Sequence, residues 1–190
     1  MKQLIVPLAL LLPLAVAAEQ PSYNHIEGGF NYQDPPGRYG SSDNGIKVRG
    51  SYALDEIVFV RGGFSSHRFD RRTGPPGDRR TTTTDRDLLN LGVGLRVPTE
   101  QALDLYGAVD ILFDFGDADD AGVRVEGGAR SMLAGAWDTG GGVRVDFIDS
   151  RSNVQVFANT WYPVADQLSL GGELAVGDFD EVLLGARYSF

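Results

Sequence analysis

The stretch Val182-Leu-Leu-Gly-Ala-Arg-Tyr-Ser-Phe190 decides the fold. Its even positions are all apolar, whereas its odd positions are mostly small or polar and include Arg187. This period of two, kept over nine residues, is typical of a β-strand that crosses a membrane. A free strand edge with an apolar stripe would aggregate, so this strand must pair on both sides, as it does in a closed sheet.

The end of this stretch also carries a family resemblance. Gly185-Ala-Arg-Tyr-Ser-Phe190 resembles the closing strand of Gram-negative outer-membrane β-barrels, of the small opacity-protein-like and outer-membrane-protein-A-like kind. Tyr188 and Phe190 are similar to the aromatic assembly signal that the barrel-assembly machinery reads in that family. The resemblance covers the whole mature chain and implies a protein of the cell outer membrane, in contact with its lipid and lipopolysaccharide.

The first residues read as an export signal. Residues 1–18 contain Lys2, a run of apolar residues and then small residues, which predicts a secretory signal peptide cleaved after Ala17 or Ala18. The alternative is an uncleaved anchor. We expect Sec-type export, and residues 19–190 as one barrel domain.

Charge and cysteine content exclude several classes of function. Without Lys2 the chain has 16 basic and 26 acidic residues, a net charge of −10, which argues against a nucleic-acid partner. The absence of cysteine excludes a disulfide framework and a thiolate site.

Period-two runs recur along the mature chain and predict an all-β fold, a closed antiparallel up-and-down transmembrane β-barrel. Ten strands fit best, with eight as the alternative. Short connections alternate with longer ones, of which Gln33–Asn44 and Arg68–Arg86 are the longest, and short turns are typical of the periplasmic side. The expected strands are 23–32, 45–54, 57–67, 87–97, 102–114, 122–132, 137–148, 153–163, 168–178 and 182–190.

The two faces of these strands differ in charge. One face carries Leu, Val and Ile without charges, and the other carries eight basic and seven acidic residues. Such a set can neutralise itself across a narrow lumen, so we expect a lumen filled by ion pairs, with a narrow channel as the alternative. The expected lumen charges are Glu27, Lys47, Arg49, Arg61, Arg96, Asp104, Asp110, Arg124, Glu126, Arg130, Asp138, Arg144, Asp146, Glu173 and Arg187.

Aromatic residues are sorted by depth along the strands, and a soluble core gives no reason for such sorting. They therefore predict the two interfacial girdles of a membrane barrel. One level, at the short-turn ends, comprises Tyr52, Trp137, Tyr162, Tyr188 and Phe190; the other comprises Phe30, Tyr32, Phe64, Phe113, Phe147 and Phe179.

Catalytic chemistry is weakly indicated. Ser65, His67 and Asp70 could form a nucleophile, base and orienting acid, as in a lipid-modifying or proteolytic barrel, but no surrounding motif supports this. We interpret His67 and His25 as solvated rim residues. The carboxylates of Asp114–Asp120 do not match a calcium loop, so no catalytic residue, metal or cofactor is predicted.

The long connection Arg68–Arg86 is the expected interaction surface. It holds six arginines against three aspartates, a net charge of +3 within an acidic chain. Part of it can continue the flanking strands as a hairpin, and arginine suits phosphate groups such as those of lipopolysaccharide. The alternative is a solvated loop that pairs with its own aspartates. We therefore expect a non-enzymatic monomer with a surface-interaction or envelope-stability role, and binding residues Arg71, Arg72, Arg79 and Arg80.

Overall fold

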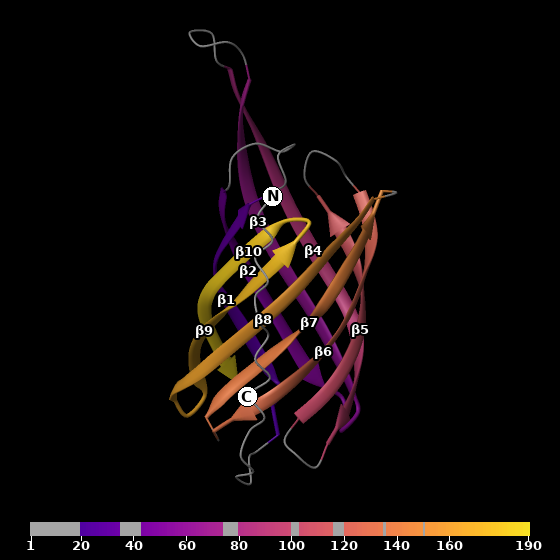
Figure 1. Cartoon of the computed structure of the whole chain (residues 1–190), viewed down its shortest axis with the longest axis vertical. Coiled ribbons are helices and arrows are strands. Elements are labelled where there is room, and N and C mark those ends of the chain that lie inside the picture. The colour runs from indigo at the N-terminus through magenta and orange to yellow at the C-terminus, as the bar shows by residue number, and fades with distance from the viewer. Residues whose placement is uncertain are drawn as a thin grey trace, which may run out of the picture.

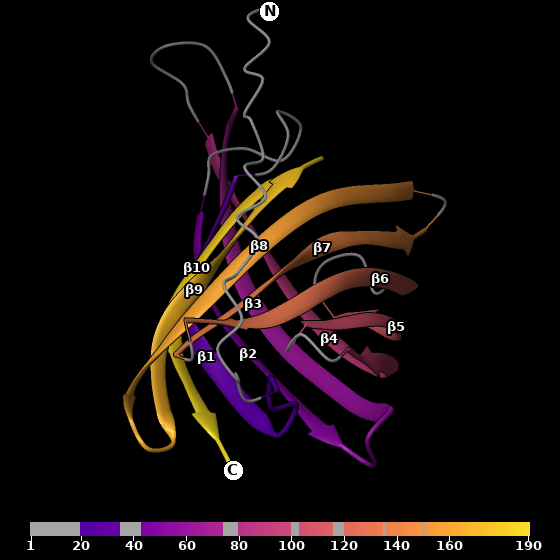
Figure 2. The same ribbon diagram turned by 60° about the horizontal axis from the view of Figure 1, so that its bottom comes forward.

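The computed structural model describes residues 20–34, 43–73, 80–99, 103–115, 120–134, 136–149 and 151–190, which form a closed barrel (Figure 1). Each strand pairs antiparallel with its neighbour in the chain, and β10 closes the ring on β1 (Figure 2). The strands are β1 (His25–Asp34), β2 (Asp43–Ala53), β3 (Val58–Thr73), β4 (Arg80–Pro98), β5 (Leu103–Asp114), β6 (Asp120–Leu133), β7 (Trp137–Ile148), β8 (Arg151–Ala165), β9 (Leu168–Gly177) and β10 (Asp180–Ser189).

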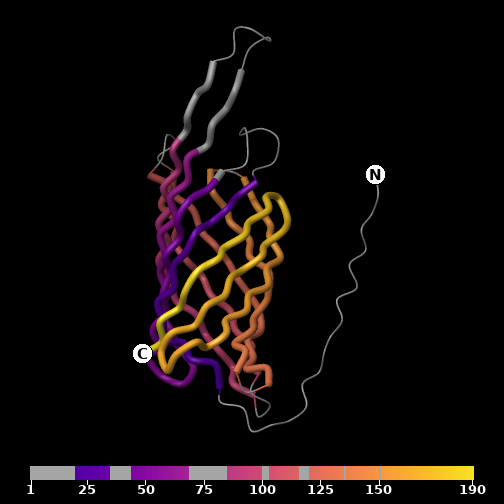
Figure 3. The backbone as a smooth tube through the Cα atoms, turned by 90° about the vertical axis from the view of Figure 1, so that its left-hand side faces the viewer, coloured from indigo at the N-terminus to yellow at the C-terminus, as the bar shows by residue number. Residues whose placement is uncertain are grey.

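This architecture confirms the predicted all-β up-and-down barrel with ten strands rather than eight. The strands run obliquely to the long axis of the barrel (Figure 3), as closure of a sheet requires. No helix in the described ranges is long and apolar enough to cross a bilayer. The predicted signal peptide, residues 1–18, lies outside the described residues.

The period-two pattern sets which side chains face outward. Val93 pairs with Val60 on one side and Val109 on the other, and all three are largely exposed on the outer wall. Leu170 and Leu184 continue this apolar surface on β9 and β10. The intervening positions turn into the lumen, where most charged side chains are buried.

The β2–β3, β4–β5, β6–β7 and β8–β9 turns lie at one end of the barrel, together with the start of β1 and the end of β10 (Figure 1). We call this end the short-turn end, although the β7–β8 and β9–β10 turns at the other end are also short. In the β2–β3 turn, Asp55 Oδ1 accepts hydrogen bonds from the backbone N–H groups of Val58 and Ile57, each at 2.7 Å. These two bonds lower the pKa of Asp55, because they favour the charged carboxylate. The turn is thereby closed by a local side-chain contact.

The strands of the β3–β4 hairpin are longer than the predicted strands 57–67 and 87–97. Its strands contain 16 and 19 residues, and their pairing continues from His67 with Arg86 to Thr73 with Arg80. Most of the predicted loop Arg68–Arg86 is thus a hairpin that rises beyond the other strands (Figure 1). The remaining strand ends lie within about two residues of their predicted positions.

Aromatic side chains stand on the outer wall near both ends. At the short-turn end, Tyr52 stacks on Phe190 at 6.5 Å between ring centroids, and Trp137 contacts Tyr162 at 4.8 Å. At the other end Phe30 is 80% exposed. Phe179 is an exception to the predicted outer level, because it lines a cavity at the mouth of the lumen.

Candidate functional site

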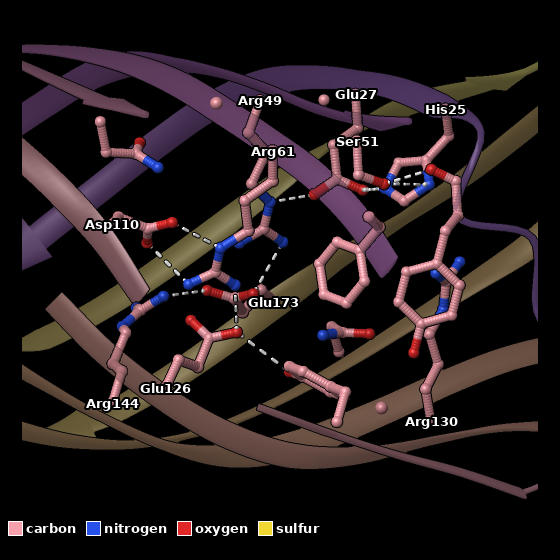
Figure 4. A pocket seen from close by; sticks show the side chains of 18 of the residues that line it. His25, Glu27, Arg49, Ser51, Arg61, Asp110, Glu126, Arg130, Arg144 and Glu173 are labelled. Atoms are coloured by element: carbon pink, nitrogen blue, oxygen red, sulfur yellow. Dashed lines mark hydrogen bonds and ion pairs between the residues drawn. The ribbon is translucent and has the colours of Figure 1, made fainter. Parts of the chain in front are cut away.

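The lumen is the most densely organised part of the barrel (Figure 4). Every charged residue predicted for it takes part in at least one ion pair. Alternation along each strand brings these side chains inward, and the small lumen-facing glycines leave room for arginines to reach across. Gly185 shows how tight this wall is, since a Cβ there would lie 2.1 Å from the carbonyl oxygen of Gly28.

One group of ion pairs centres on Glu173 of β9. Its two oxygens accept from Arg49 Nη2 at 2.7 Å and from Arg144 Nη1 at 2.9 Å. Arg49 also pairs with Glu27, and Lys47 lies 4.0 Å from Glu173. Side chains of β2 and β7 thus converge on a single carboxylate of β9, and Arg49 links it to Glu27 of β1.

A second group centres on Arg61 of β3. Its guanidinium binds both oxygens of Asp110, at 2.7 and 2.6 Å, and its third nitrogen donates to Glu126 at 2.7 Å. The hydroxyl of Tyr106 donates to the same Glu126 oxygen at 3.0 Å. Bidentate pairs of this kind fix both the distance and the orientation of the side chains.

Further pairs extend the network towards both ends of the lumen. Arg124 binds both oxygens of Asp146, at 2.6 and 2.7 Å. Nearer the short-turn end, Asp138 accepts from Arg130 at 2.8 Å and from Arg187 at 2.6 Å. The remaining two predicted lumen charges, Arg96 and Asp104, pair with each other at 3.3 Å.

Glu181 was not among the predicted lumen charges, because the last strand was expected to start at residue 182. Because β10 begins at Asp180, Glu181 points into the lumen, where it pairs with Lys47 and, at 3.4 Å, with Arg144. Glu181 lies on the same strand face as Arg187, so the alternation along the strand could have predicted its place in the lumen. Glu181 brings the predicted set of lumen charges to eight cations and eight anions.

Apolar side chains were also missed in the lumen. Phe157 lies under the guanidinium of Arg144, and Trp161 lies 4.5 Å from that of Arg187. Both are buried, as are Phe59, Leu112 and Leu183. These residues fill space between the ion pairs.

The described residues line two cavities in the lumen. One, of about 120 Å³, lies towards the short-turn end, and the other, of about 30 Å³, lies towards the outer mouth. Side chains of Lys47, Arg49, Arg124 and Asn90 line both cavities and so stand between them. The lumen is therefore divided by charged side chains.

Neither histidine is a solvated rim residue, so that interpretation was wrong. His67 is 5% exposed, and its Nε2 lies 2.9 Å from Asn31 Nδ2. His25 is also buried, with Nδ1 at 3.3 Å from Ser51 Oγ, but that hydroxyl donates to the carbonyl oxygen of Tyr23. The side chain of Asp70 lies outside the described residues.

The other predicted features are less completely described. Of the carboxylates in 114–120, Asp114 pairs with Arg86 at 2.8 Å, and residues 116–119 lie outside the described ranges. No group of three acidic or histidine residues in the described part could hold a metal ion. Arg79, and the side chains of Arg71, Arg72 and Arg80, also lie outside the described residues.

The predicted assembly signal sits at the closing seam of the barrel. Tyr188 pairs with Ile26 of β1 in the strand register, and the backbone N–H of Phe190 donates to Asn24 at 3.1 Å. The aromatic rings of Tyr188 and Phe190 stack at 6.5 Å. Both side chains are exposed on the outer wall.

A closed barrel with an apolar outer wall, aromatic residues at both ends and an ionic lumen defines a membrane-spanning β-barrel. The chain belongs to the outer membrane protein beta-barrel domain family, whose model matches residues 4–190. It is thus an outer-membrane protein, and proteins of this kind contact the lipid and lipopolysaccharide of that membrane. The short-turn end is accordingly the periplasmic end.

Solved structures share this fold at low sequence identity. The KdgM porin in complex with disordered oligogalacturonate is 9% identical, with a TM-score of 0.56, over 87% of this chain and 99% of that one. OprG from Pseudomonas aeruginosa is 16% identical, with a TM-score of 0.51, over 93% and 99%. A search of curated proteins gave no match.

Proposed function

We propose that this outer-membrane barrel is a non-enzymatic surface-interaction protein that acts through its β3–β4 hairpin. The observation that carries the proposal is the length of the hairpin beyond the wall. Pairing between β2 and β3 reaches only His67, and pairing between β4 and β5 reaches only Leu88, whereas β3 and β4 remain paired as far as Thr73 and Arg80. The barrel thus holds a two-stranded arm above the membrane.

The charge of this arm indicates the class of its ligand. Residues 68–86 carry a net charge of +3 in a chain of net −9. Arg68 pairs with Asp85 at 2.9 Å, and the register places Arg71 opposite Thr82 and Arg72 opposite Thr81. We infer that Arg71, Arg72, Arg79 and Arg80 bind phosphate groups of lipopolysaccharide or another polyanion.

The structure of the lumen favours a role other than transport. Its charges are paired, and Lys47, Arg49 and Arg124 separate its two cavities. We therefore expect no conductance of the wild-type protein in planar bilayers, and steady single-channel currents would favour the alternative, a narrow channel. A non-enzymatic role is supported by Ser51, whose hydroxyl donates to a backbone carbonyl rather than to His25.

We also propose that Tyr188 and Phe190 form the signal for the barrel-assembly machinery. Their place beside β1 at the closing seam, with exposed rings, supports this role. Replacing Phe190 with Ala should lower the amount of folded barrel in the outer membrane. Tyr52→Ala, at the same level of the outer wall, is the matched control and should assemble normally.

Binding of purified protein to immobilised lipopolysaccharide, measured across a range of salt concentrations, tests the proposed ligand. Replacing Arg71, Arg72, Arg79 and Arg80 together with Ser should leave the barrel folded and weaken binding. Replacing the same four residues with Lys is the matched control, because it keeps the charge and removes the bidentate geometry. It should bind at an intermediate level, with the salt dependence of the wild type. Unchanged binding by the Ser variant, or binding indifferent to salt, would refute the proposal.

A further inference from the structure

The segment before β1 lies inside the periplasmic end of the barrel. Residues 20–24 form no strand, yet Pro21 is fully enclosed and Tyr23 is only 5% exposed. A large aromatic side chain in a short irregular segment is buried to this extent only if the rest of the protein provides a pocket for it. The residues around Tyr23 therefore indicate what the segment does.

The pocket consists of one aromatic ring and two guanidinium groups. The ring of Phe59 lies 4.7 Å from that of Tyr23, and Phe59 in turn contacts Tyr106. The guanidinium carbons of Arg96 and Arg130 stand 4.7 and 5.0 Å from the centre of the Tyr23 ring. Cations at this distance from an aromatic face attract it, and more strongly where water is excluded.

Hydrogen bonds hold the same segment on both sides. The hydroxyl of Ser51 donates to the carbonyl oxygen of Tyr23, and the backbone N–H of Ala53 donates to Asn24 Oδ1 at 2.8 Å. On the other side, the N–H of Phe190 donates to the carbonyl oxygen of Asn24. The segment is thus anchored to the ends of both β2 and β10.

Tyr23 also forms part of the wall of the larger lumen cavity, together with Phe59 and Asn159. We propose that the periplasmic opening is a receptor for the chain's own segment 20–24, and that Tyr23 is the plug that closes this cavity from the periplasm. This inference concerns access to the lumen and is independent of the hairpin. The hydroxyl of Tyr23 has no hydrogen-bond partner among the described residues, so the ring carries the contact.

A single cysteine can report access to the cavity, because the chain contains none. Asn159→Cys places a thiol on the cavity wall, and Ser65→Cys places one on the wall of the outer cavity. The rate of modification by a small charged thiol reagent is measured for each in folded, detergent-solubilised protein. Retention of fast SDS-gel mobility without heating confirms that each variant is folded.

Tyr23→Ala should speed labelling of the Asn159→Cys thiol at least about tenfold, equivalent to about 1.4 kcal/mol, and leave the Ser65→Cys thiol unchanged. With Tyr23→Phe, the Asn159→Cys thiol should be labelled as slowly as it is with Tyr23 present, because the aromatic ring is kept. Asn24→Ala removes one anchor and serves as the second variant if Tyr23→Ala does not fold; it should give an intermediate rate. Equal rates at Asn159→Cys with and without the Tyr23 ring would overturn the proposal, and so would acceleration at both thiols, which would indicate a general loosening of the barrel.

Discussion

Replacing Arg144 with Met should strongly destabilise the barrel, because this side chain connects three strands inside the lumen. Its guanidinium donates to Gln155 at 2.8 Å, Glu173 at 2.9 Å and Glu181 at 3.4 Å, and it is almost fully buried. Removing one partner of a buried ion pair costs about 3–5 kcal/mol, since the remaining charge is left buried. Glu173 keeps Arg49, and Glu181 keeps Lys47, so we expect the lower end of that range.

Urea unfolding of refolded protein in micelles, followed by tryptophan fluorescence, measures this change. Trp161 is buried in the lumen beside Arg187 and reports directly on that region. The matched control is Arg68→Met, whose ion pair with Asp85 has side chains 72% and 58% exposed and should contribute at most about 1 kcal/mol.

The double variant of Arg144→Met with Glu173→Gln separates pairing from packing. It removes one cation and one anion together, so it should lose less stability than the sum of the two single variants, by about 0.5–3 kcal/mol. Additive losses, or a single Arg144→Met variant that unfolds at the wild-type urea concentration, would refute the view that these charges stabilise the barrel as a network.

Three further predictions concern the wall of the barrel. Val93→Arg places a charge on the exposed apolar face and should destabilise by about 2–4 kcal/mol in lipid; a wild-type unfolding midpoint would mean that this face does not contact the membrane. Gly94→Ser should cost about 1–3 kcal/mol, because a Cβ at Gly94 would lie 2.1 Å from Phe59 Cζ; a neutral effect in the same assay would show that the Phe59 ring can move aside. Unheated protein should run faster than heated protein on SDS gels, because a closed barrel resists SDS, and equal mobility would contradict a stable barrel.

The fold was well predicted from the sequence because alternate residues of a membrane-barrel strand face lipid and lumen, and the two sets differ in polarity. One face of each strand contacts lipid and the other faces the lumen. The alternation of residue types along the strand was therefore enough to assign Val93 outward and Arg61 inward. Parity failed where a strand end was misplaced, as at Glu181. Part of Arg68–Arg86 was expected to continue the strands as a hairpin, but its length depends on pairing between β3 and β4 that local pattern does not determine.

The lumen contacts were less predictable, for a geometric reason. Some pairs join neighbouring strands and follow from register, as Arg124 opposite Asp146 does on β6 and β7. Others cross the lumen, as Arg49 of β2 reaches Glu173 of β9, and depend on the tilt and diameter of the closed barrel. The position of Tyr23 was unpredictable for the same reason, because its pocket exists only after Phe59, Arg96 and Arg130 have been brought together by closure.

The closing strand shows how backbone and side-chain contacts support each other. β10 completes the ring through its ladder with β1, and on the same seam Arg187 of β10 donates to Glu27 of β1 at 2.7 Å. Glu27 also holds Arg49 of β2, so the ionic network continues past the point where the two ends of the sheet meet. An open sheet would leave Glu27 and Arg187 without this partner and would expose the edges of both strands. The nine residues 182–190 indicate a membrane strand by their alternation. They therefore also join β10 to β1 in two ways, by backbone hydrogen bonds in the wall and by an ion pair in the lumen.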